Sequence, residues 1–165
     1  MLELRPGRAD DLPRLVAIYN HYVEKTSITF DIEPFTVETR RPWFEQFAPR
    51  GRYRLIVAVH AAEPVGWACT VRFRTKRAYD PSVETSIYLA PHWTGRGLGM
   101  RLYAELFNAL AGEDVHRAYA GVTLPNEPSV ALHEKAGFTR VGLMHEVGFK
   151  LGSYWDVAWY EKPLP

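Results

Sequence analysis

The sequence predicts a single α/β domain in which helices cover both faces of a mixed β-sheet. An apolar strand over residues 83–89 leads through a glycine loop into a helix whose apolar residues recur at spacings of three and four. Around this unit, apolar runs and helical patterns follow in the order β-α-α-β-β-β-α-β-α-β-β. We therefore expect a twisted sheet of about seven strands flanked by about four helices, in one domain over residues 1–165.

Composition excludes several classes of protein. The net charge is +1 with no long run of either sign, so we expect no nucleic-acid partner. Residues 1–5 lack the apolar stretch of a signal peptide, and no apolar run approaches membrane length, which predicts no membrane partner. Cys69 is the only cysteine and lies in an apolar strand, so we expect a core residue in a cytoplasmic protein. Six scattered histidines without paired spacing predict no metal.

The N-terminal part predicts one strand and two helices. Residues 2–5 alternate as a short strand. Asp10 or Asp11 is expected to cap a helix that has Pro13 in its first turn. Residues 22–34 are polar and irregular, with Phe30 at their centre.

A second helix is expected to start at Thr36. Thr39 stands where a capping box usually has glutamate, so the signal is partial. Pro42 is expected to kink or divide this helix, because proline lacks the amide hydrogen that the helix interior needs.

Strands dominate the centre of the chain. Residues 53–60 form a dense β-branched run, residues 61–63 a hairpin turn, and residues 64–73 an antiparallel return strand. Residues 74–82 read as a polar connection to the strand over residues 83–89.

The C-terminal part closes the sheet. Residues 118–124 are predicted as a strand, and Asn126 as the cap of a short helix that Gly137 ends. Residues 138–146 and 154–160 are the last two predicted strands.

The loop over residues 94–99, Thr-Gly-Arg-Gly-Leu-Gly, is the strongest local signal. Glycines at a helix start let backbone amides converge on an anion such as a phosphate. A tight turn without a ligand is the alternative. A P-loop is excluded because Met100 and Arg101 stand where lysine and serine or threonine are needed. Leu102 occupies the position of the third glycine in a dinucleotide fingerprint.

The loop and the element order resemble those of the GNAT N-acetyltransferases across essentially the whole chain. Thr94 stands where that family usually has glutamine or arginine. The resemblance implies the GNAT fold and acetyl-CoA as co-substrate. It also implies that the loop holds the pyrophosphate, that the preceding strand pairs with the pantetheine arm and that an asparagine assists. On this chain these are Gly95, Arg96, Gly97, Leu98, Gly99 and Met100; Ile87, Tyr88 and Leu89; and Asn126.

A second signature covers residues 126–138. It resembles the GNAT motif in which an asparagine opens a helix and tyrosine commonly occupies the position of His133. Asn126 and His133 are seven residues apart, so they share a helix face about 10 Å apart along the axis. The alternative is that Asn126 is only a cap and His133 a packed histidine.

Further residues narrow the resemblance to the phosphinothricin N-acetyltransferase branch. They are His133, Glu84, residues 74–79 and residues 148–157. The branch implies acetylation of the α-amino group of phosphinothricin, methionine sulfoximine or a related small amino acid, by direct attack in a ternary complex.

The reaction needs a group that removes a proton from the amine. Glu84 is one candidate for this group. Alternatively, Glu84 is only a strand residue that faces solvent or pairs with an arginine. His133 can serve as base or as donor to the departing thiolate, and the sequence leaves this assignment open. A backbone amide near Leu89 is expected to stabilise the oxyanion.

Acceptor recognition is expected from Arg74 and Lys76, with Phe30 and Tyr79 as apolar walls. Alternatively, Arg74 and Lys76 are only the charged residues of a solvent-exposed connection, with no role in binding the acceptor. The order arginine then lysine reverses the order typical of phosphinothricin-selective members. We also expect a homodimer, with Trp155 and Trp159 placed in the core or at the dimer contact.

Two rival functions remain. One is a GNAT enzyme for another small amine, although a polyamine suits Arg74 and Lys76 poorly. The other is a non-catalytic acyl-CoA-binding module, which would not need Glu84 and His133 together.

Overall fold

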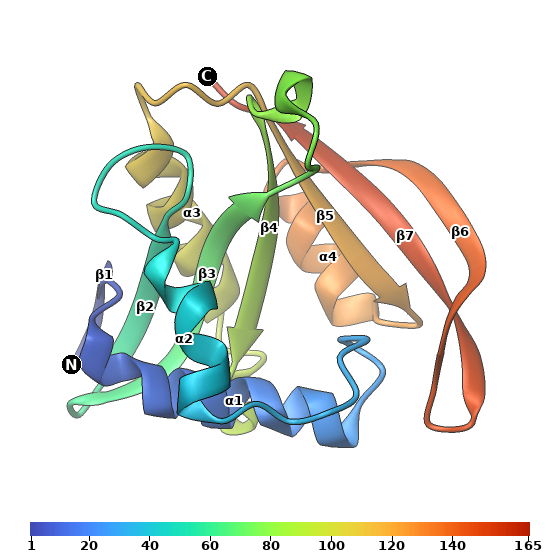
Figure 1. Cartoon of the computed structure of the whole chain (residues 1–165), viewed down its shortest axis with the longest axis horizontal. Coiled ribbons are helices and arrows are strands. Elements are labelled where there is room, and N and C mark those ends of the chain that lie inside the picture. Colours follow the sequence, from blue (N-terminus) through green and yellow to red (C-terminus); the bar gives the residue numbers. More distant parts are fainter.

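The computed structural model describes residues 1–165 and contains one seven-stranded sheet with strand order β1-β2-β3-β4-β5-β7-β6 (Figure 1). The predicted number and order of the main elements are confirmed. The strands are β1 (Leu2–Pro6), β2 (Leu55–His60), β3 (Glu63–Arg72), β4 (Ser82–Leu89), β5 (Arg117–Leu124), β6 (Thr139–Lys150) and β7 (Ser153–Pro163), and the helices are α1 (Leu12–Lys25), α2 (Val37–Glu45), α3 (Leu98–Leu110) and α4 (Glu127–Lys135).

The pairing of β4 with β5 gives the sheet an opening. All other neighbouring strands pair antiparallel, whereas β4 and β5 are parallel and pair only over Ser82–Glu84 and Arg117–Tyr119. Beyond these residues the two strands diverge (Figure 1). Because nothing pairs with the far half of β4 on this side, its backbone and side chains line a wedge-shaped gap.

Two apolar clusters lie on opposite faces of the sheet. On β2, Ile56 and Ala58 pack toward α3, whereas Leu55, Val57 and Val59 pack toward α1. This burial on both faces explains why β2 reads as a continuous apolar run. Cys69 belongs to the second cluster and is buried, as predicted.

The start of α1 differs from the prediction in one detail. Asp11 occupies the N-cap position, and Pro13 lies in the first turn, but the Asp11 side chain makes no cap bond to α1. Its carboxylate instead accepts from the Arg8 amide at 2.7 Å and pairs with the Arg5 guanidinium at 2.8 Å. The acidic residue therefore ties the end of β1 to the turn that precedes α1.

The predicted capping box of α2 is confirmed. The Thr39 amide donates to the Thr36 hydroxyl at 3.1 Å, and the Thr36 amide donates to the Thr39 hydroxyl at 2.9 Å. The helix is continuous from Val37 to Glu45 through Pro42, so the division considered for this position does not occur.

The β6–β7 hairpin is longer than predicted. The expected end of the first strand near Glu146 coincides with a bulge, where the register shifts between Met144 and Gly148 and Glu146 has φ of 49°. A bulge breaks the alternation of the sequence pattern, so the pattern does not predict the continuation to Lys150.

No helix has the length and apolar character needed to cross a membrane.

Candidate active site

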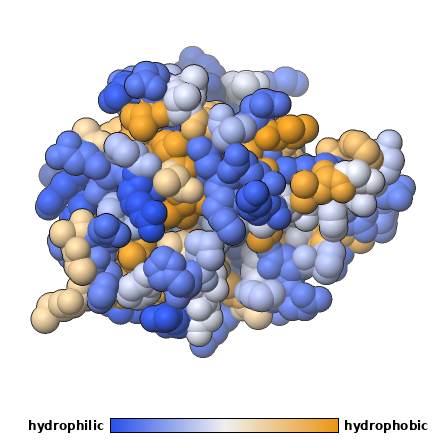
Figure 2. Space-filling model, turned by 90° about the horizontal axis from the view of Figure 1, so that it is seen from below, coloured by the Kyte–Doolittle hydropathy of each residue, from blue (hydrophilic) through white to orange (hydrophobic).

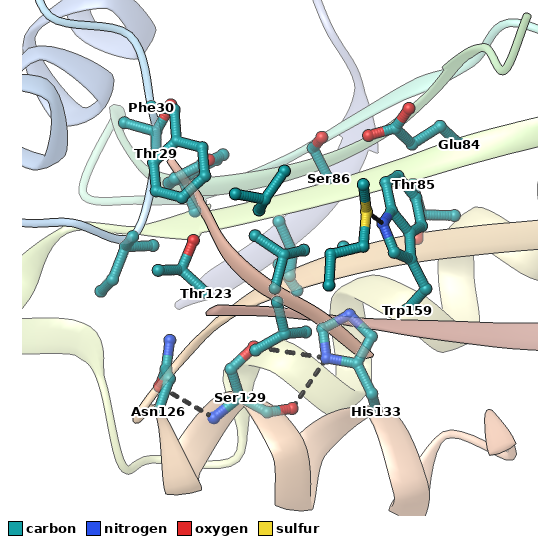
Figure 3. A pocket seen from close by; sticks show the side chains of 18 of the residues that line it. Thr29, Phe30, Glu84, Thr85, Ser86, Thr123, Asn126, Ser129, His133 and Trp159 are labelled. Carbon is teal, nitrogen blue, oxygen red and sulfur yellow. Dashed lines mark hydrogen bonds between the residues drawn. The ribbon is translucent and has the colours of Figure 1, made fainter. Parts of the chain in front are cut away.

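A cavity of about 370 Å³ fills the wedge between β4 and β5. Its walls come from the loop after α1, from both diverging strands, from α3 and α4, and from the β6–β7 hairpin (Figure 3). The lining residues are Ile28, Thr29, Phe30, Glu84, Thr85, Ser86, Ile87, Tyr88, Tyr103, Gly121, Val122, Thr123, Asn126, Ser129, His133, Met144, Val147, Val157 and Trp159.

A second cavity, of about 340 Å³, lies beside the glycine loop. It is lined by Gly95, Gly97, Leu98, Gly99 and Met100, together with residues of β4 and α4. Both cavities share lining residues, so they open into each other at the diverging end of β4. The shared residues are Ile28, Ile87, Tyr88, Asn126 and Ser129.

The glycines of the loop serve different needs. Gly95 and Gly97 have φ of 72° and 74°, a left-handed conformation that favours glycine, and a β-carbon on either would project into open space. A β-carbon on Gly99 would lie 2.9 Å from the Leu132 side chain, so Gly99 allows α3 to approach α4. Gly97 is the N-cap of α3, whose N-terminus therefore faces the cavity with free amides. This arrangement fits a pyrophosphate.

The far half of β4 presents backbone amides to the gap. The Ala90 amide donates to the Val65 carbonyl of β3 at 2.8 Å. Because amide direction alternates along a strand, the amides of Ile87 and Leu89 face away from β3 and toward the gap. The Tyr22 hydroxyl donates to the Leu89 carbonyl, in agreement with this direction. These free amides fit the pantetheine arm and thioester of an acyl-CoA.

Asn126 contributes to both cavities. Its side-chain oxygen accepts from the Ser129 amide at 3.2 Å, which caps α4 as predicted. The amide nitrogen of the same side chain points into the cavity (Figure 3). The residue therefore serves as a cap and still offers a donor to a ligand.

His133 is buried, and both of its ring nitrogens have partners. Nδ1 lies 2.7 Å from the Ser129 carbonyl, which can only accept, so Nδ1 carries the hydrogen. Nε2 therefore accepts from the Tyr103 hydroxyl at 2.7 Å. Burial lowers the pKa of His133, with the bond to the Ser129 carbonyl opposing, so the ring is neutral at pH 7. In this state the Tyr103–His133 pair can accept a proton.

Glu84 lies on the other side of the cavity from His133 (Figure 3). Burial raises the pKa of Glu84, and the guanidinium of Arg74 opposes that rise. A carboxylate with a raised pKa in a cavity is suited to proton transfer near neutral pH. Glu84 is half-buried, whereas His133 is only 4% exposed, so solvent reaches the first group more easily.

The structure does not bring all the predicted acceptor residues together. Phe30 lines the cavity, whereas Arg74, Lys76 and Tyr79 do not. Arg74 stacks over Phe73 at 4.9 Å and reaches the site only through its charge on Glu84, while Tyr79 packs against Phe73. Glu84 is the only acidic or basic side chain in the lining besides neutral His133.

Several cavity residues were missed by sequence reasoning. Tyr103 belongs to the apolar stripe of α3, so its hydroxyl gave no separate signal, although Thr85 approaches it at 3.3 Å. Trp159, expected in the core or at a dimer contact, instead forms a cavity wall, where its indole nitrogen lies 3.1 Å from the Met144 sulfur. No cluster of three or more His, Cys, Asp or Glu side chains is arranged to hold a metal ion.

Comparison with known proteins decides the family. The model of the acetyltransferase (GNAT) family matches residues 15–138. The chain belongs to the GNAT family. It is an N-acetyltransferase, and acetyl-CoA is its co-substrate.

The similar proteins share the full length of the GNAT domain. A phosphinothricin N-acetyltransferase of Streptomyces coelicolor is 55% identical, covering 99% of this chain and 96% of that protein. A methionine sulfoximine and methionine sulfone acetyltransferase of Pseudomonas aeruginosa is 30% identical, covering 98% and 94%. The structure of a phosphinothricin acetyltransferase from Sinorhizobium meliloti in complex with acetyl-CoA superposes with a TM-score of 0.92 at 32% identity, covering 99% and 88%.

Proposed function

We propose that this enzyme acetylates the α-amino group of phosphinothricin, methionine sulfoximine or methionine sulfone, and thereby inactivates toxic amino acid analogues. The names of the similar proteins support this choice of acceptor. The observation that carries the proposal is that the two cavities meet, and that Glu84 lies on one side of the first cavity and the Tyr103–His133 pair on the other. An acetyl-CoA in the second cavity would direct its thioester toward an amine in the first.

Two protons must leave the amine during the reaction. An ammonium group loses one proton before it attacks the thioester, and the new bond leaves a second proton on nitrogen. Glu84 accepts the first, directly or through water, and passes it to solvent, because it is the more exposed group. The Tyr103 oxygen accepts the second as its own proton moves to His133 Nε2. The pair then returns this proton to the departing thiolate, so the proton count balances.

The attack also places negative charge on the former carbonyl oxygen. The Leu89 amide faces the gap and has no partner from a neighbouring strand, so it can donate to this oxyanion. The amide of Ile87 lies one ladder step earlier and is available to the pantetheine.

A specific observation favours acceptors with an uncharged side chain. Just over half of the lining residues are apolar, Phe30, Met144 and Trp159 among them, and no lysine or arginine lines the cavity. The sulfoximine and sulfone side chains need no cation, whereas a phosphinate does. Arg74, whose charge acts on Glu84, is the cation that we assign to phosphinothricin; like Lys76 and Tyr79, it lies outside the cavity lining and would contact the phosphinate only if the connection over residues 74–82 moved inward.

We also propose a cytoplasmic homodimer. Exposed apolar side chains gather on the β6–β7 hairpin, which lies at the right-hand end of Figure 2. A patch of this kind marks an interaction surface, and a second copy would cover it. The patch comprises Val141, Met144, Val147, Phe149, Leu151 and Tyr154. A cytoplasmic location suits an enzyme that uses acetyl-CoA and has a single, free cysteine.

The direct test measures release of free CoA from acetyl-CoA with phosphinothricin, methionine sulfoximine, methionine sulfone, the common amino acids and spermidine. We expect release with the three analogues and, among them, a lower KM for the sulfoximine or sulfone. Release of CoA only with other amines would support the acetyltransferase activity but exclude the proposed acceptors. Binding of acetyl-CoA without release by any amine would favour a non-catalytic acyl-CoA-binding module.

A further inference from the structure

Residues 148–157 form a distinctive motif that the catalytic steps above do not use. In the structure its first residues lie against the loop that follows α1, residues 26–31. Ile28, Thr29 and Phe30 of this loop form one side of the acceptor cavity (Figure 3). Hairpin and loop are thus far apart in sequence but meet at the acceptor site.

Lys150 makes the polar part of this contact. Its side chain is 5% exposed, and Nζ donates to the Thr29 carbonyl at 2.7 Å and to the Tyr22 carbonyl at 3.5 Å. A buried ammonium is unfavourable unless hydrogen bonds replace its water. The bond to Thr29 holds the backbone of a residue that lines the cavity.

The position of Tyr22 adds an electrostatic contribution. Tyr22 lies in the last turn of α1, where the carbonyl groups carry the negative end of the helix dipole. Its carbonyl also accepts from the Thr26 hydroxyl at 2.8 Å. The Lys150 ammonium therefore binds the C-terminal end of α1 and the loop together.

Gly148 makes the apolar part of the contact. A β-carbon at this position would lie 2.3 Å from the Phe30 ring, so the ring rests directly on the glycine backbone. The bulge between Met144 and Gly148 allows this contact, and it also places Val147 in the cavity wall. Any larger residue at position 148 would displace Phe30.

We propose that Lys150 and Gly148 are positioning residues that hold residues 26–31 over the acceptor cavity and thereby set the affinity for the acceptor amine. The inference rests on the proposed function for the identity of the acceptor, but the contact itself can be tested without an acceptor. Neither residue touches the reacting atoms, so both act through Thr29 and Phe30.

The kinetic test compares Lys150→Met with Arg140→Met, which alters an exposed side chain on the same strand. We expect Lys150→Met to raise the KM for methionine sulfoximine about tenfold, which is about 1.4 kcal/mol, and the KM for acetyl-CoA by less than about twofold. An equal rise in both KM values, or an unchanged KM for methionine sulfoximine, would contradict the positioning role.

A second pair of variants tests the ring contact. Gly148→Ala should raise the acceptor KM, whereas Gly142→Ala on the same strand should not, because a β-carbon at position 142 meets nothing within 4 Å. Gly148→Ala should raise the acceptor KM less in an enzyme that already carries Phe30→Leu than in the otherwise unaltered enzyme. Strictly additive effects would show that the two residues do not act through their contact.

Hydrogen exchange in the free enzyme separates this inference from the proposed function. We expect the amides of residues 26–31 to exchange faster in Lys150→Met than in Arg140→Met, while the melting temperatures of both variants stay close to that of the unaltered enzyme. Unchanged exchange would overturn the inference even if every acceptor assay succeeded. Absence of acetylation by the unaltered enzyme would overturn the acceptor assignment and leave the exchange result standing.

Discussion

Replacing Glu84 with glutamine tests the proton transfer most sharply. Glutamine keeps the shape of the side chain but cannot accept a proton. An amine with a pKa between about 8 and 10 is deprotonated to only about 0.1–10% at pH 7, so an enzyme without its first proton acceptor must wait for this minor form. We expect kcat/KM for the acceptor to fall about 100-fold at pH 7, within the range typical of general acid–base catalysis.

The pH dependence identifies the role. As pH rises toward 9 the free amine becomes common, so the deficit of Glu84→Gln should shrink to about tenfold or less. His133→Ala should lose activity by a factor that does not shrink, because its proton is handled after the attack. The assay is CoA release over pH 6.5–9, with the Kd for acetyl-CoA measured by calorimetry as control. A Glu84→Gln enzyme with full activity at pH 7, or with a deficit that stays constant with pH, would exclude Glu84 as the first proton acceptor.

Three further predictions follow from individual contacts. Gly97→Val should weaken acetyl-CoA binding at least about tenfold, because its left-handed φ costs an ordinary residue about 1–2 kcal/mol and more for a β-branched one; unchanged affinity would remove this glycine from the binding loop. Arg74→Ala should raise the KM for phosphinothricin more than that for methionine sulfone, and it should raise the pKa of Glu84 seen in the acid limb of the pH profile, since Arg74 opposes the effect of burial; equal changes for both acceptors would exclude a role in phosphinate recognition. Burial acts to raise the pKa of Asp11, but its bonds to Arg5 and the Arg8 amide lower it overall, so its contribution to stability is present above its ordinary pKa of 3.8 and is lost as pH falls through the lower folded value. Asp11→Asn should therefore lower the free energy of unfolding by about 1–3 kcal/mol at pH 7, with a smaller difference at pH 3 in urea titrations; a difference independent of pH would contradict the charge-based account.

The sequence predicts the fold well where the signal is local. The glycine loop, the capping box of Thr36 and the asparagine cap of α4 all depend on residues a few positions apart, and the structure has each of them. The β6–β7 bulge escaped prediction because residues such as Glu146 adopt an unusual backbone conformation that no propensity encodes.

The site was predicted less completely than the fold. Glu84 and His133 are predicted from the family resemblance and Phe30 as an apolar wall, and all three line one cavity. Tyr103 could not be found in this way, because its position in an apolar helix stripe explains a buried ring without any role for the hydroxyl. Lys76 is predicted at the acceptor from its charge and its two-residue spacing from Arg74, and neither says which way a connection between two strands turns.

We expect acetyl to pass directly from the thioester to the amine where the two cavities meet. Initial rates measured over a grid of acetyl-CoA and methionine sulfoximine concentrations test it, because transfer within a ternary complex gives intersecting double-reciprocal lines. We expect intersecting lines and no acetylated enzyme in the absence of the amine. Parallel lines together with an acetylated form of the protein would show a covalent route and contradict it.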